Sequence, residues 1–262
     1  MTILDQIIAD KREEVEASKK LISIADLQSS PYFKRTCLSL KSRLLEAPGI
    51  IAEFKRKSPS KGWINEDADV VEVTSEYSEA GAAGISILTD SKYFGGVQQE
   101  LTSARPHVRC PILRKDFMID EYQLYEAKSI GADVILLIAA ALSPSECKHL
   151  ASKAKELGLE VLLEVHTREE LEYCCDEVDM VGVNNRNLKT FEVSTDLSLE
   201  LAPHIPERFV KISESGLSDA ETVKMLIEHG YRGFLMGENF MKEKEPGEAL
   251  RRFISWRYAS LR

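Results

Sequence analysis

Short apolar runs rich in β-forming residues recur along the chain, and stretches with the spacing of an amphipathic helix lie between them. The starts of successive runs are 20 to 34 residues apart, which fits a strand, a loop and a helix. The pattern therefore predicts eight strands, at residues 50–54, 84–88, 111–113, 133–138, 160–165, 180–183, 209–212 and 233–236.

Strict alternation of strands and helices is typical of a parallel sheet with right-handed crossovers. The run 134–138 is apolar throughout, as in a strand covered on both faces. Eight units in 262 residues predict an α/β fold of the closed (β/α)8 type, a TIM barrel, rather than an open doubly wound sheet. No glycine-rich dinucleotide or P-loop motif follows the first strand.

Helix boundaries are marked by capping residues. Residues 70–80 place Val70, Val73 and Tyr77 on one face, and Ser143 followed by Pro144 predicts a helix start. Capping boxes begin at Thr167 and Ser218. Glycines suited to helix C-termini follow at positions 81, 131, 158 and 230.

The 48 residues before the first strand carry Ile3, Leu4, Ile7 and Ile8 at helical spacing. They predict an extension of about two helices that is too short to fold alone and covers one end of the barrel. We expect residues 1–262 to form one domain, with 1–48 as the helical extension and 49–262 as the barrel.

Composition and charge narrow the function classes. With 34 basic and 43 acidic residues the net charge is −9, so nucleic acid and anionic membranes are unsuitable partners. The longest apolar run, 134–142, is too short to span a bilayer. Five cysteines form no CxxC pair, which favours a reducing cytoplasm. The five histidines lack metal-ligand spacing, so we expect no metal, and we interpret His166 as a loop histidine without a catalytic role.

Charged residues follow or interrupt the apolar runs where a barrel carries its chemistry, at the C-terminal ends of the strands. Side chains alternate along a strand, so Glu53 and Lys55 should point the same way. Glu53 and Glu164 lie inside apolar runs, where an unpaired carboxylate is costly. Acids and bases meeting at one mouth suit proton transfer. The residues expected there are Glu53, Lys55, Lys115, Glu164, Asn184, Arg186 and Glu214.

Small residues after the last two strands suit a phosphate. Ser215, Gly216 and Gly237 let backbone N–H groups approach an anion, and barrels commonly bind phosphate in these two loops.

These motifs closely resemble the indole-3-glycerol-phosphate synthase family of tryptophan biosynthesis. The block IAEFKRKSPSKG at 51–62 is the most specific. It is followed in order by ILTD and YFGG at 87–96, LRKDF at 113–117, LEVH at 163–166, GVNNRNL at 182–188 and ESG at 214–216. The resemblance covers essentially the whole chain.

The resemblance implies closure of the indole ring of 1-(2-carboxyphenylamino)-1-deoxyribulose 5-phosphate, with loss of CO2 and water and without cofactor or metal. It implies Lys115 as the general acid at the ketone, Lys55 as partner of the substrate carboxylate, and Glu164 as the group that assists dehydration. Glu53, Asn184 and Glu214 are implied to orient the lysines and the sugar hydroxyls.

The resemblance also implies a phosphate site and an aromatic site. Phe94 and Phe117 should sandwich the anthranilate ring, and Arg186 should support the site. Glu238 departs from the small hydroxyl residue of many relatives, so its side chain should turn away from the phosphate. The implied phosphate residues are Ser58, Ser215, Gly216, Gly237 and Glu238.

Two other interpretations remain open at this point. A phosphoribosylanthranilate isomerase would need a cysteine base near the first strand, where this chain has Glu53 and Lys55. A non-catalytic barrel that senses a sugar phosphate would keep the phosphate loops and lose the acid–base set. We expect a cytoplasmic monomer that acts on a small anionic sugar phosphate carrying an anthranilate ring.

Overall fold

Eight parallel strands close into a barrel in the part of the chain that the structure, a computed structural model, describes, residues 2–188 and 190–255. They are β1 (Gly49–Phe54), β4 (Gly84–Leu88), β5 (Ile112–Lys115), β6 (Val134–Ile138), β7 (Glu160–Val165), β8 (Met180–Asn184), β9 (Val210–Glu214) and β10 (Tyr231–Met236). Their order around the barrel is β1, β10, β9, β8, β7, β6, β5, β4 and back to β1. The predicted (β/α)8 barrel is confirmed.

The strand ends differ from the predicted ranges where polar residues continue the pairing. β5 extends to Lys115 and β9 to Glu214, because their backbones still pair with the neighbouring strands. A small antiparallel hairpin of β2 (Lys57–Ser58) and β3 (Gly62–Trp63) follows β1 and was not predicted.

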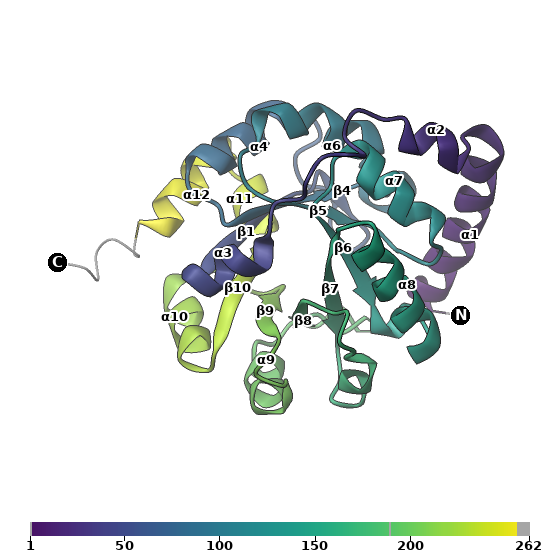
Figure 1. Cartoon of the computed structure of the whole chain (residues 1–262). Helices are drawn as coiled ribbons and strands as arrows, with labels where there is room; N and C mark the ends of the chain where they lie inside the picture. The colour runs from purple at the N-terminus through teal and green to yellow at the C-terminus, as the bar shows by residue number, and fades with distance from the viewer. Residues whose placement is uncertain (1, 189, 256–262) are drawn as a thin grey trace.

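Helices surround the strands, as Figure 1 shows. None of those in the described ranges combines the length and apolar character that crossing a bilayer requires. The α-helices are α1 (Ile3–Leu21), α2 (Ile24–Gln28), α3 (Leu40–Glu46), α4 (Val70–Glu79), α5 (Ser91–Phe94), α6 (Gln98–Ala104), α7 (Tyr122–Ile130), α8 (Pro144–Glu156), α9 (Asp196–Leu201), α10 (Ala220–Glu228), α11 (Glu238–Met241) and α12 (Pro246–Ile254). Short 3-10 helices are η1 (Arg105–His107), η2 (Ala139–Ala141), η3 (Glu169–Tyr173) and η4 (Ala202–His204).

The predicted helix signals are mostly confirmed. Ser143 caps α8 in a capping box with Pro144 in its first turn, and the predicted face of α4 is buried. All four predicted C-terminal glycines have positive φ.

Two predicted capping boxes are wrong. Asp219, not Ser218, caps α10, because its carboxylate accepts the N–H of Thr222 at 2.8 Å. The Thr167 hydroxyl accepts the N–H of Glu170 at 3.4 Å, but the Glu170 carboxylate accepts the N–H of His166 rather than that of Thr167, so the box is incomplete. The short 3-10 helix η3 forms there in place of an α-helix.

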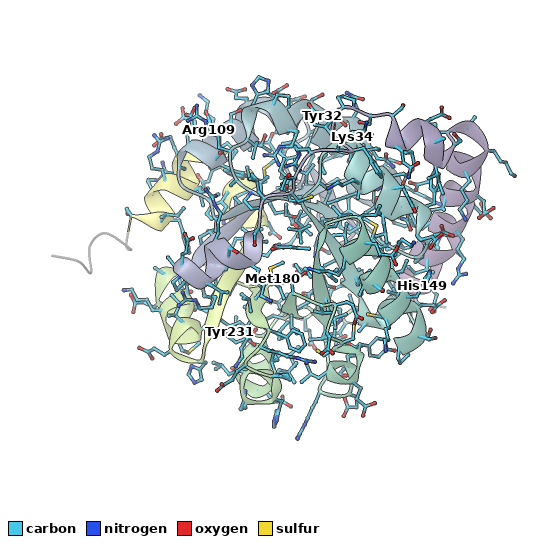
Figure 2. The ribbon with its side chains drawn as sticks, in the orientation of Figure 1. Tyr32, Lys34, Arg109, His149, Met180 and Tyr231 are labelled. Atoms are coloured by element: carbon cyan, nitrogen blue, oxygen red, sulfur yellow. The ribbon has the colours of Figure 1, made fainter. Side chains whose placement is uncertain are left out.

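The core has two principal layers. One lies between the strands and the surrounding helices, and the other fills the barrel interior. Met180, near the middle of the view in Figure 2, belongs to the interior layer and is fully buried. Filling the interior with apolar side chains leaves a closed floor beneath the C-terminal mouth.

The N-terminal extension has three helices rather than about two, and it covers both ends of the barrel rather than one. Leu40 and Leu44 of α3 pack into the apolar layer inside the barrel. At the opposite, C-terminal end, Ile3, Leu4 and Ile7 of α1 line the mouth. Figure 1 shows α1 and α2 at the outer edge of the ring of helices.

The packing of α3 into the N-terminal end of the barrel, here called the α3 plug, predicts different effects on stability for two adjacent leucines. Leu44 is fully buried, whereas Leu45 is 58% exposed. Leu44→Ala should lower the free energy of unfolding by about 2–5 kcal/mol, because it leaves a cavity under the barrel. The matched control Leu45→Ala should stay within about 0.5 kcal/mol of the wild type. Urea unfolding followed by circular dichroism measures both, and similar losses in the two variants would contradict the plug.

Candidate active site

A cavity opens at the C-terminal end of the barrel, where the side chains that end the strands converge. The sequence-predicted residues that border it are Glu53, Lys55, Ser58, Phe94, Lys115, Phe117, Glu164, Asn184, Arg186, Glu214, Ser215 and Glu238. Gly216 and Gly237 adjoin these residues but do not border the cavity themselves. Sequence reasoning did not assign the apolar part of the wall, which includes Leu88, Leu136, Ile138, Leu188 and Leu235.

Glu53 and Lys55 point the same way, as predicted. The Nζ atom of Lys55 lies 2.7 Å from Oε1 of Glu53, and the hydroxyl of Ser86 donates to Oε2 of Glu53 at 3.3 Å. Glu53 is buried while the Lys55 side chain keeps 20% exposure. The buried Glu53 carboxylate therefore fixes the position of the Lys55 ammonium at the cavity wall.

Lys115 lies at the centre of the floor. Its ammonium donates to Oε2 of Glu164 at 2.8 Å and to Oε2 of Glu214 at 2.9 Å. Burial alone would lower the pKa of Lys115, but Glu164, Glu214 and Glu53 outweigh it and raise the pKa. Lys115 of β5 is consequently a charged group that is held by carboxylates of two other strands, β7 and β9.

The two carboxylates beside Lys115 titrate differently. Burial would raise the pKa of Glu164, but Lys115 and His166 lower it, so this group stays ionised. The pKa of Glu214 is raised to about 7, because burial and the charges of Glu164 and Glu53 exceed the attraction of Lys115. Two neighbouring acids with pKa values pushed apart are a common arrangement for proton transfer.

Gly182 on β8 makes the position of Glu214 possible. A Cβ atom at Gly182 would lie 2.2 Å from Oε1 of Glu214. That oxygen is buried and has no hydrogen-bond partner among the described residues. A buried acceptor without a partner is costly, and it is consistent with a group that carries a proton or awaits a ligand.

His166, interpreted from the sequence as a loop histidine without a catalytic role, follows β7 and packs against Glu164. Its Nε2 atom lies 3.3 Å from Oε1 of Glu164, and its Nδ1 atom lies 3.6 Å from Oε2 of Glu170. The side chain is only 9% exposed. Its adjacency to Glu164 in LEVH was the available signal, but sequence does not determine how a chain turns after a strand.

Neighbouring asparagines on β8 and its loop have separate functions. Oδ1 of Asn184 accepts the backbone N–H of Arg186 at 3.1 Å, which orients the Asn184 amide at the cavity wall. Asn185, which sequence reasoning did not assign, is buried and donates to the carbonyl of Ser215 at 3.0 Å. Asn185 thus holds the loop that follows β9.

The expected phosphate side of the mouth has a strained backbone. Ser215 and Gly216 both have left-handed φ values, 68° and 73°, and this conformation is unusual for serine. Position 237 has room only for glycine, because a Cβ atom there would lie 2.9 Å from the Glu53 side chain. Glu238 begins α11 and faces Lys61 across the mouth at 3.8 Å.

Phe94 and Phe117, which were expected to sandwich the anthranilate ring, lie close to each other at the cavity wall. Their ring centroids are 6.1 Å apart and their planes are tilted by 38°. A ring stacked between them would need a separation of about 7 Å, because each pair of stacked faces requires about 3.5 Å. The two rings instead form one aromatic wall of the cavity.

A buried ion network attaches α1 to the strand ends beside Lys115, and sequence reasoning missed it. Nζ of Lys11 lies 3.0 Å from both Asp90 and Asp116, and these three side chains are at most 3% exposed. Arg114 contacts the other oxygen of Asp116 at 3.0 Å. Burial would raise the pKa of Asp116, but Arg114 and Lys11 bring it down to about 2. The network fixes the helix that covers the mouth.

Comparison with known proteins identifies relatives of high similarity. The family described as indole-3-glycerol phosphate synthase matches residues 4–253. The indole-3-glycerol phosphate synthase of Bacteroides thetaiotaomicron is 53% identical over 253 residues, covering 96% of this chain and 97% of that protein. The synthase of Chromobacterium violaceum is 45% identical over 258 residues, with coverage of 96% and 97%.

Solved structures with lower sequence identity share the fold. A chain of the tryptophan synthase complex of Pyrococcus furiosus is similar with a TM-score of 0.59 and 18% identity, covering 80% of this chain and 97% of that one. KGPDC from Streptococcus mutans gives a TM-score of 0.59 and 13% identity, covering 79% and 95%. These two similarities support the barrel alone, whereas the family match spans both the barrel and the helix that covers its mouth, and the chain belongs to the indole-3-glycerol phosphate synthase family.

Proposed function

We propose that the protein converts 1-(2-carboxyphenylamino)-1-deoxyribulose 5-phosphate into indole-3-glycerol phosphate, CO2 and water. The observation that carries this proposal is the Lys115 ammonium, held on the cavity floor between Glu164 and Glu214. Ring closure onto a ketone requires a positioned group that donates a proton to the ketone oxygen and nearby groups that accept and return protons.

In the first step the ring carbon that bears the carboxylate attacks the ketone carbon of the sugar chain. The carbonyl π electrons move to the ketone oxygen, which takes a proton from Lys115 and becomes a hydroxyl group. The bond to the carboxylate then breaks, CO2 leaves, and its electron pair restores the aromatic ring. Lys55 balances the charge of that carboxylate until it departs, and Glu53 holds Lys55 in position.

In the second step the new hydroxyl group takes a proton and leaves as water. A proton is then removed from the adjacent carbon, and the double bond of the indole ring forms. Lys115, once it has regained a proton, is the donor that we assign to the hydroxyl group. Glu164, which is ionised, contacts Lys115 and borders the cavity, accepts the proton from the carbon. Asn184 and Glu214 position the sugar hydroxyls.

Substrate binding uses the two unlike sides of the mouth. The anthranilate ring meets the apolar residues of α1 and the wall of Phe94 and Phe117. The phosphate is assigned to Ser58, Ser215 and the backbone of Gly216, Gly237 and Glu238. Arg186 supports the same rim.

The isomerase alternative is less well supported by this site. It requires a cysteine base at the mouth, and the cavity described above is lined by none of the five cysteines. The sensor alternative is also less well supported, because a protein that only binds a sugar phosphate would not need the buried charges of Lys115, Glu164 and Glu214.

We also propose that the protein acts in the cytoplasm as a monomer without nucleic acid. All five cysteines are free thiols, as suits a reducing compartment, and the net charge of −9 disfavours polyanions. Light scattering coupled to size exclusion tests the oligomeric state.

Lys115→Met should abolish most of the activity without preventing substrate binding. The variant keeps much of the stem volume but removes the proton donor, so kcat should fall by at least about 10²–10⁴-fold. Indole fluorescence appearing from purified protein and substrate measures turnover, with the exposed Lys148→Met as control. No signal from the wild type would refute the proposed function, and a variant retaining more than about a tenth of wild-type kcat would exclude Lys115 as the essential acid.

Ser215→Ala should weaken substrate binding more than it slows turnover. Loss of one hydrogen bond to a charged group costs about 1.5–3 kcal/mol, so KM should rise by about 10-fold or more. A phosphate contact serves ground and transition states alike, so kcat should change little. Steady-state kinetics compares this variant with the exposed neighbour Ser218→Ala. A normal KM with a low kcat would remove Ser215 from the phosphate site.

The pH profile should report Glu214. Because its pKa is raised to about 7, the ionised form is lost as the pH falls through neutrality. Lys115 then loses one of its two contacting charges, so kcat/KM should decline on the acidic side of about pH 7. Glu214→Gln mimics the neutral form of Glu214, so in this variant kcat/KM should be low and should no longer depend on pH below neutrality. An unchanged acidic limb in the variant would assign the titration to another group.

A further inference from the structure

A second cavity, of about 880 Å³, adjoins the active-site cavity. Arg186 and Leu188 border both cavities, so the loop that follows β8 forms the partition between them. Glu164 borders only the active-site cavity, whereas His166 and Glu170 border only the second one. The Glu164–His166 pair therefore spans the partition.

A continuous series of ionisable groups crosses this partition. It runs from Nζ of Lys115 to Oε2 of Glu164 at 2.8 Å, and from Oε1 of Glu164 to Nε2 of His166 at 3.3 Å. Nδ1 of His166 then lies 3.6 Å from Glu170. Both ring nitrogens of His166 are buried and form no aligned hydrogen bond among the described residues. The Glu170 carboxylate, which borders the second cavity, is therefore the group through which the ring can receive a proton.

The reaction assigned to this site takes up a proton from solvent. One proton goes to the ketone oxygen and one to the departing hydroxyl group, while a single proton is released from the carbon next to it. CO2 leaves as a neutral molecule from a carboxylate. The balance is substrate carboxylate plus one proton giving product, CO2 and water, so Lys115 must be recharged in every cycle.

The mouth is a poor route for that proton while substrate is bound. The Lys115 side chain is 14% exposed and that of Glu164 4% exposed, and both border the cavity that the substrate would fill. A ligand in the cavity separates them from the water of the mouth. The second cavity is bordered by His166, which contacts the Glu164 carboxylate from the other side of the partition.

We propose that His166 relays the proton from the second cavity to Glu164 and thus recharges Lys115, an inference that rests on the proposed function. His166 acts through Glu164 and does not border the active-site cavity. The imidazolium passes the proton on Nε2 to the Glu164 carboxylate and becomes a neutral ring with its remaining proton on Nδ1. The ring then turns, so that its bare nitrogen faces Glu170 and the second cavity, and takes up a new proton there. No oxidant or reductant is involved.

The surrounding charges are compatible with this role. Glu164 from β7 and Glu170 from η3 face the ring, and Arg186 and Glu192 of the β8 loop border the same cavity. Burial would lower the pKa of His166, but the two facing carboxylates raise it to about 9. The ring therefore holds a proton at neutral pH.

His166→Ala should separate the relay from a structural role. Ring closure can use the proton already on Lys115, so CO2 release should show a burst of about one equivalent per site, followed by a kcat lowered by about 10²-fold. KM should stay near that of the wild type. Imidazole should enter the second cavity and restore kcat, with a dependence on pH that follows imidazole ionisation.

His149→Ala is the matched control, because His149 is exposed at the outer edge of the molecule in Figure 2. This variant should keep the wild-type kcat, and imidazole should not change it. If His166→Ala folds poorly, Glu170→Gln, which keeps the ring, should show a smaller loss of kcat at constant KM. A wild-type kcat in the substituted enzyme, or a loss without burst and without rescue by imidazole, would overturn the relay. An inactive wild type would instead refute the proposed function.

Discussion

A buried ammonium between buried carboxylates is the constraint on which the site depends. Lys115, Glu164 and Glu214 end three different strands, and none of them could be buried alone without a large desolvation cost. They are compatible with the interior only when the sheet is closed and brings the three strand ends together. Barrel closure and assembly of this cluster of charges are therefore one event.

Glycines on β8 and just after β10 make room for these charges. Gly182 leaves space for Glu214, and Gly237 leaves space for Glu53, where any larger side chain would collide with a carboxylate. The glycine at 237 can thus be required by the acid–base cluster as well as by a phosphate. The positions of the buried carboxylates in the cavity floor therefore depend on glycine at 182 and 237.

Sequence patterns predicted the barrel and most of the site because their periods are local. Alternation along a strand placed Glu53 and Lys55 on one side, and eight strand ends defined one mouth. What was missed depends on contacts distant in sequence or on loop paths. Lys11 meets Asp116 only through the docking of α1, Leu44 enters the barrel only once it is closed, and the turn after β7 directs His166 toward Glu164. The mutual contact of Phe94 and Phe117 likewise depends on how the chain turns into α5 after β4 and away from β5.

The position of α3 under the barrel also sets an order of events during synthesis on the ribosome. This helix leaves the ribosome early, yet Leu44 packs beside Gly233, which is made almost two hundred residues later. Contacts of such long sequence separation form slowly, and until then the apolar face of α3 has no partner in the growing chain. The nascent chain thus exposes Leu40 and Leu44 for most of its synthesis, as a surface that chaperones can bind.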